Sequence, residues 1–376
     1  VAVATGINIG TSVLVSQLFG AKRYLRMKTA ISTALITTTV VSLLLTLFGA
    51  SADAMVYAYP YMMLYLIGTL PSMIATGMNP FINAQGYSSI GMLSVAIGAG
   101  TNLVLDPLFI FALGLGVRGA AIATVFGQIV GGIVAIVLNV RRNRELAFRF
   151  RGFRPDGKLC GSILFIGIPS AIMGAIGSFM TYGVNKILFA FEEVGKTAAA
   201  VFGVYFKLQS FVFMPVFGLN NGMVPIVSYN YGAKRPDRIT QTIRLSAIYA
   251  VAIMAAGVAV VQLIPDKLLL LFDASEQMLT IGVPALRIIS TCFVFAGFSI
   301  VCSSVFQALG NSIFSMIMSI TRQLAVLLPA AYILAHAFGL HAVWYAFPIA
   351  EFASLALSII MLSHTYKKVI MPLAAD

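Results

Sequence analysis

Charged residues are scarce in this chain. Asp, Glu, Lys and Arg make up only 10% of its 376 residues, whereas soluble domains contain about 25%. Hydrophobic residues reach 60% and the mean hydropathy is +0.96. A soluble globular domain is therefore excluded. The composition indicates an all-α polytopic membrane protein, whose principal neighbour is the lipid bilayer.

Cysteine and histidine are equally scarce, with three residues of each. Cys160, Cys292 and Cys302 form neither a Cys-x-x-Cys pair nor a Cys/His spacing typical of zinc. The sequence also contains no His-Glu-x-x-His, no phosphate-binding loop and no Gly-x-Ser-x-Gly elbow. We therefore expect no resident cofactor and no catalytic residues, which makes an enzyme the weakest interpretation.

Acidic residues are half as numerous as basic ones, 12 against 24, so the net charge is +12. A nucleic-acid partner would require basic residues clustered on a folded domain. Here they lie in short segments between apolar runs, at 22–28, 141–158, 234–244 and 367–368. We predict no nucleic-acid partner. The positive-inside rule instead places these segments and the C-terminus in the cytoplasm, and the protein in the cytoplasmic (inner) membrane.

The chain contains an internal repeat. Gly6 to Arg23 reads GINIGTSVLVSQLFGAKR and Gly218 to Arg235 reads GLNNGMVPIVSYNYGAKR, at an offset of 212 residues. Later matches have offsets of 222 to 224, including Pro107 with Pro329 and Gly116 with Gly339. The halves therefore run in parallel, and the second has 12 extra residues before Leu271. In a membrane protein, a repeat predicts two homologous bundles around a substrate path.

Apolar runs long enough to span a bilayer predict eleven helices. They fall near 1–19, 28–50, 56–82, 90–113, 118–140, 160–190, 198–222, 240–264, 277–306, 312–335 and 341–363. Five precede the basic linker 141–158 and six follow it. The chain begins inside an apolar run without Met, which favours a fragment lacking one upstream helix. The expected organisation is a first lobe over 1–140, the linker 141–158 and a second lobe over 159–376.

Asp106 is the strongest candidate for a functional residue. A carboxylate inside a spanning helix costs roughly 2.5–3.5 kcal/mol on insertion scales. Asn102 lies four residues earlier, on the same helix face, and Pro107 frees local carbonyl oxygens. These oxygens could bind a small hard cation such as Na⁺, or a proton. The alternative is a structural carboxylate bonded to neighbouring helices.

Five further polar residues in or near spans could contact substrate or belong to a site in the second lobe. Glu351 is the other acid well inside a span, and the repeat places it opposite Gln128 at an offset of 223. Lys207 and Arg322 could neutralise acids or contact substrate, and Asn185 could also contact substrate. For Glu351, the alternative is a hydrogen-bonded core glutamate.

The motifs together resemble a known family. They are the two Gly-x-Asn-x-Gly…Gly-Ala-Lys-Arg copies, Asn102-x-x-x-Asp106-Pro107, Gly119-Ala-Ala-Ile-Ala-Thr124 and Gly339-x-x-x-x-Trp344. With them, the chain is similar over its length to the multidrug and toxic compound extrusion (MATE) transporters. The resemblance implies two six-helix lobes in a V shape, alternating access, a monomer, and export of lipophilic organic cations in exchange for Na⁺ or H⁺.

The resemblance is to the bacterial branch that includes the DNA-damage-inducible and archaeal members. There the cation site uses an acid on helix 1, Asn and Asp on helix 5, and Thr on helix 6. Asn102, Asp106 and Thr124 match the last three, and the helix 1 acid would lie upstream of Val1. The other main branch carries a glutamate in helix 7, which 171–188 lacks. The alternatives are a lipid-linked precursor flippase using Lys207 and Arg322, and an ion channel.

Overall fold

The computed structural model describes residues 87–142, 157–191 and 194–374, together with 71, 77–79 and 82–83. The spans predicted over 1–19 and 28–50 and most of 56–82 lie outside these residues. So do the first copy of the repeat motif and most of the linker 141–158. The chain divides into two compact units, unit 1 with residues 1–171 and 228–233, and unit 2 with residues 172–227 and 234–376.

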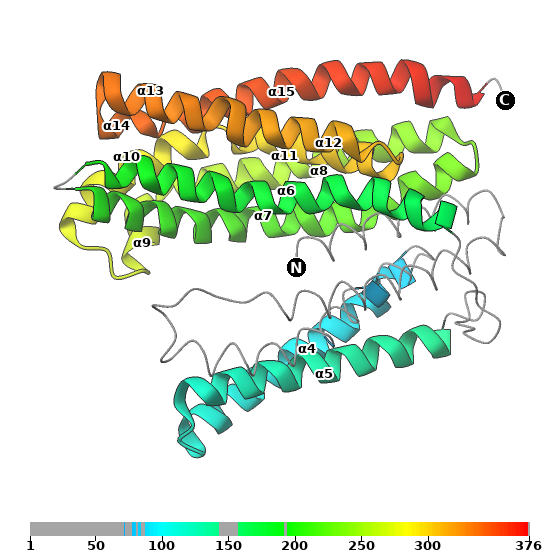
Figure 1. Ribbon diagram of the computed structural model, residues 1–376, viewed down its shortest axis with the longest axis horizontal. Helices are drawn as coiled ribbons and strands as arrows, with labels where there is room; N and C mark the ends of the chain where they lie inside the picture. The colour runs from blue at the N-terminus through cyan, green and yellow to red at the C-terminus, as the bar shows by residue number, and fades with distance from the viewer. Residues whose placement is uncertain are drawn as a thin grey trace. The chain divides into compact units, whose positions relative to one another are not determined.

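Unit 1 presents a helical hairpin. α4 (Ser88–Pro107) continues through a π-helical turn, η2 (Leu108–Ala112), and α5 (Gly116–Arg142) returns alongside α4 (Figure 1). Gly114 (φ 65°) and Gly116 (φ 53°) form the reversal with left-handed backbone, which glycine adopts at little cost. The polar residues of the first half are thereby placed on two antiparallel neighbours.

Unit 2 is a helical bundle, and its long helices run side by side along one direction in Figure 1. It begins with the greater part of α6 (Gly157–Phe189) and α7 (Gly195–Gly232), followed by α8 (Pro236–Leu263). The remaining elements are α9 (Pro265–Leu270), α10 (Glu276–Ser290), α11 (Phe293–Ala308), α12 (Ser312–Ile320), the π-helical turn η3 (Thr321–Leu327), α13 (Leu328–Phe338), α14 (Leu340–Val343), α15 (Ala346–Thr365), η4 (Tyr366–Ile370) and η5 (Met371–Ala374).

The predicted spans of the described part are confirmed. Seven of its helices are long and apolar enough to cross a bilayer, and the bent pair α10 and α11 makes an eighth if it is one span. These eight correspond to the eight runs predicted from residue 90 onward. The chain is therefore an all-helical, multi-span membrane protein.

The prediction of one continuous helix over 277–306 is wrong, because α10 and α11 meet at an angle of 50°. Three successive side chains account for the break. Ser290, Thr291 and Cys292 donate to the carbonyl oxygens three residues earlier, at 3.2, 2.7 and 3.0 Å. Side chains that hydrogen-bond nearby carbonyls compete with the helical ladder and bend the helix.

Candidate functional site

The hairpin of unit 1 brings Asn102, Asp106 and Thr124 together. Asn102 and Asp106 lie one turn apart on α4, and the Asn102 amide Nδ2 donates to Asp106 Oδ1 at 3.2 Å. The same nitrogen lies 3.5 Å from Thr124 Oγ1 on α5. The Thr124 hydroxyl in turn donates to the Ala120 carbonyl at 2.9 Å, which fixes its rotamer. All three side chains are half-buried, so the network that joins the two helices is partly shielded from the surroundings.

Glycines allow this contact. A Cβ on Gly127 of α5 would lie 2.7 Å from the Gly98 carbonyl oxygen and 3.0 Å from Asn102 Cβ. A Cβ on Gly98 would lie 2.9 Å from the Gly127 carbonyl oxygen. Small residues at such positions let helix backbones approach closely in membranes. The distance between Asn102 and Thr124 therefore depends on glycine at both positions.

The chemistry of the three residues suits a small cation. They offer one carboxylate, one hydroxyl and one amide, and the structure groups no three His, Cys, Asp or Glu side chains within its described residues. A divalent transition metal takes His, Cys or several carboxylates. A single carboxylate with neutral oxygen donors fits a monovalent hard cation or a proton, which here would be the transported coupling ion rather than a resident cofactor.

Gln128 lies one turn beyond Thr124 on α5, on the same face of the helix. It is half-buried, and its Oε1 is buried without a hydrogen-bond partner in the described structure. Gln128 is therefore a near neighbour of the network rather than a member of it.

Unit 2 contains a partly buried ion pair. Arg322 of η3 donates to Glu351 of α15, with 3.0 Å between Arg322 Nη1 and Glu351 Oε1. The side chains are 24% and 13% exposed, respectively. The pairing is the neutralisation considered for Arg322 from the sequence. Because the two charges cancel, the pair adds no net charge to this part of unit 2.

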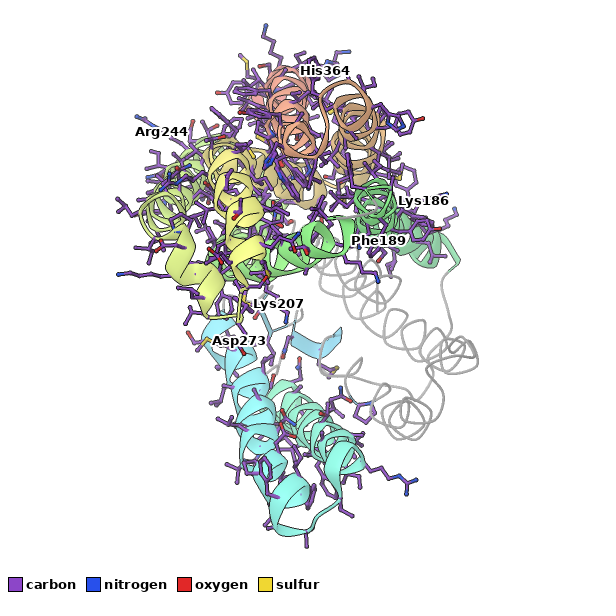
Figure 2. The ribbon with its side chains drawn as sticks, turned by 90° about the vertical axis from the view of Figure 1, so that its left-hand side faces the viewer. Lys186, Phe189, Lys207, Arg244, Asp273 and His364 are labelled. Carbon is purple, nitrogen blue, oxygen red and sulfur yellow. The ribbon has the colours of Figure 1, made fainter. Side chains whose placement is uncertain are left out.

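Lys207 and Asn185 do not join this ion pair. Lys207 is exposed on α7, where its Nζ lies 5.6 Å from the centre of the Phe272 ring, at the edge where Figure 2 labels Lys207 and Asp273. Asn185 is half-buried on α6, and its side chain makes no hydrogen bond within the described part of the chain.

Sequence reasoning missed the surroundings of Glu351. Tyr205 of α7 and Cys292, at the break between α10 and α11, interact electrostatically with Glu351 and Arg322. Phe347 lies one turn before Glu351, and its ring centre is 5.6 Å from that of Tyr205. A tyrosine and a phenylalanine inside apolar runs give no sequence signal, since aromatic residues are common in such helices.

Comparison with known proteins decides the family. A family model described as MatE matches residues 1–108 and 169–333, well over half of the chain. The chain belongs to the MatE family. These proteins are membrane transporters and not enzymes, so membership agrees with the helical spans and the absence of a catalytic motif.

Multidrug export proteins are among the proteins to which the chain is similar. Multidrug export protein MepA of Staphylococcus haemolyticus (strain JCSC1435) is 26% identical over 355 residues, covering 91% of this chain and 77% of its own length. Multidrug export protein MepA of Staphylococcus aureus (strain MSSA476) is 25% identical over 355 residues, covering 91% and 78%.

Solved structures of the MATE fold match the chain almost completely. A MATE transporter in the straight conformation has a TM-score of 0.91 at 25% identity, covering 100% of this chain and 86% of its own. A MOP superfamily transporter from Pyrococcus furiosus, described as having a binding pocket of reverse polarity that suggests a different function, also has a TM-score of 0.91 at 25% identity, covering 99% and 85%. The chain therefore has the MATE-like fold.

Proposed function

We propose that the protein is a secondary active transporter that exports lipophilic organic cations in exchange for Na⁺ or H⁺. The observation that carries the proposal is the hydrogen-bonded group Asn102, Asp106 and Thr124 between α4 and α5. The names of its relatives, multidrug export proteins, support the substrate class.

Asp106 has the central role in this mechanism. It is the acid of the group, and it forms no ion pair with a described residue, so its charge is free to attract a coupling cation. Asn102 and Thr124 supply neutral oxygens, and the amide can rotate to turn its oxygen toward the ion. Binding drives transport only if one conformation of the protein holds the ion more tightly than the other.

The expected organisation completes the proposal. A first lobe of residues 1–140 and a second of 159–376 alternate between inward and outward states, joined by the cytoplasmic linker 141–158. The basic segments put the C-terminus in the cytoplasm and the protein in the inner membrane. One chain contains both repeats, so a monomer is sufficient.

The test is export of a fluorescent cationic dye in everted membrane vesicles under separate Na⁺ and proton gradients. Asp106→Asn should abolish gradient-driven dye movement, because an amide cannot supply the negative charge that binds the ion. Asp266→Asn is the matched control, since Asp266 is an exposed acid in the first turn of α9. Unchanged coupled export in the Asp106→Asn variant would contradict the proposal.

The flippase alternative requires basic side chains facing an anionic headgroup. Its two candidates were Lys207 and Arg322. Arg322 is neutralised by Glu351, and Lys207 lies beside Phe272. Cation export is therefore the better supported function. Dye that moves under neither gradient would favour the flippase.

A further inference from the structure

The two oxygens of Glu351 have different surroundings. Oε1 accepts the hydrogen bond from Arg322, while Oε2 is buried and has no hydrogen-bond partner in the described structure. A buried carboxylate oxygen without a partner is costly, because its lost hydration is not replaced. Oε2 is therefore the position at which Glu351 can accept a hydrogen bond, a proton or another ligand.

The residues near Glu351 restrict which ligand its free oxygen could bind. Tyr205, Phe293 and Phe347 are 4%, 3% and 6% exposed, and their rings pack against one another. Phe347 lies one turn before Glu351 on α15, so this ring cluster begins beside the carboxyl group. A metal ion would require further oxygen ligands, and the described residues contain no group of three His, Cys, Asp or Glu side chains that could hold one. The titratable groups within electrostatic range of Glu351 are Arg322 from η3, Tyr205 from α7 and Cys292 from the break between α10 and α11. A proton needs neither space nor additional ligands.

The position is distinct from that of Asp106. The repeat places Glu351 opposite Gln128, and Asp106 opposite Leu328, so the two acids are not equivalent residues of the two halves. Each acid nevertheless lies where a helix containing a π-helical turn contacts the next long helix, α4 and η2 with α5, and η3 with α15. π-Helical turns inside α-helices often occur at functional sites.

We propose that Glu351 binds and releases a proton during the transport cycle, with Arg322 as the counter-charge of its deprotonated form. The proton is taken up on Oε2, and the carboxyl group becomes neutral while the guanidinium keeps its charge. The pair then changes from a net charge of zero to a net charge of one positive. The inference rests on the proposed function, to which it adds a second ion site.

Protonation therefore weakens the contact between η3 and α15. Arg322 loses its charged partner, and its side chain, which is 24% exposed, is not fully enclosed by the protein. A conformation in which Arg322 is more hydrated would be favoured once Glu351 is protonated. This difference between conformations is the requirement for a bound ion to drive a transport step.

The experiment is infrared difference spectroscopy of the purified protein in lipid, between acidic and neutral pH. With the proton on Oε2, the carbonyl oxygen of Glu351 is Oε1, which accepts from Arg322, so its carbonyl band differs in frequency from that of a hydrated carboxyl group. We expect a band of this kind in the wild type and its loss in Glu351→Gln, which puts into unit 2 the residue that the repeat carries as Gln128. The control Glu276→Gln, at an exposed residue of α10, should keep the band.

A second variant keeps the proposal testable if Glu351→Gln does not fold. The double change Arg322→Gln and Glu351→Gln removes both charges of the pair, and it should also lack the band. A band that persists in both variants would overturn the proposal. So would the absence of any such band in the wild type, since Glu351 would then be a structural partner of Arg322 only.

The same measurement on Asp106→Asn separates this inference from the proposed function. The Glu351 band should persist in that variant even though coupled export is lost. If Asp106→Asn keeps export and Glu351→Gln still removes the band, the coupling role of Asp106 is wrong and the proton site stands.

Discussion

Substitution of Gly127 by alanine tests how the site is assembled. The added Cβ would lie 2.7 Å from the Gly98 carbonyl oxygen, and ordinary contact begins at 3.4 Å. α4 and α5 must therefore separate by about 0.7 Å at this level. Backbone oxygen cannot rotate away as a flexible side chain can, so the helices themselves have to move.

The separation acts directly on the site. Asn102 Nδ2 and Thr124 Oγ1 are already 3.5 Å apart, so a further movement of this size breaks their hydrogen bond. Overpacking costs about 1–3 kcal/mol, and the lost hydrogen bond about 0.5–1.5 kcal/mol. If the whole free energy of the lost hydrogen bond is lost from ion binding, a loss of about 1.5 kcal/mol weakens the affinity for the coupling ion about tenfold.

The assay is the ion concentration that gives half-maximal dye export, with thermal unfolding in detergent as a second readout. Gly131→Ala is the matched control on the same face of α5. Its Cβ would meet the Ser94 carbonyl oxygen at 3.4 Å, an ordinary contact. If Gly127→Ala and Gly131→Ala behave alike in both measurements, the close approach of α4 and α5 does not set the geometry of the site.

Two other changes should affect stability. Gly339→Ala places a side chain at φ 81° and ψ −171° with no atom within 4 Å, so its cost of about 1–3 kcal/mol in stability is purely conformational. Thermal unfolding measures this cost. The control Gly203→Ala, in an open helical position, should show no loss of stability in the same experiment. Asn139→Leu removes buried hydrogen bonds to the Met78 and Ala135 carbonyls, at 3.1 and 3.0 Å, and should cost about 1–3 kcal/mol. An unfolding midpoint equal to that of the wild type would show that Asn139 does not fasten α5 to Met78.

The sequence alone predicted features that depend on local pattern. Apolar runs gave the spans, because a bilayer imposes a minimum helix length. The four-residue spacing of Asn102 and Asp106 predicted their contact, because residues four apart share a helix face. Whether these residues bind an ion remains a prediction.

Features that depend on tertiary contact could not be predicted in the same way. Nothing in the separation of Arg322 and Glu351 indicates that η3 and α15 bring them within 3.0 Å. The 50° break after Ser290 depends on the carbonyl oxygens to which Ser290, Thr291 and Cys292 donate their hydrogen bonds, and the sequence does not specify these acceptors. Asn139 stands in an apolar run, which was a usable signal, but its partner Met78 lies 61 residues away.

The ion pair of unit 2 also bears on how the chain enters the membrane. A lone arginine near the centre of a spanning helix costs about 2.5–3.5 kcal/mol during insertion. Glu351 belongs to the next span after the one containing Arg322, so neither charge is compensated until both helices have been synthesised. The last two spans should therefore leave the translocon together as a hairpin, and a nascent chain that ends before α15 should hold its arginine helix at the translocon or at the lipid boundary.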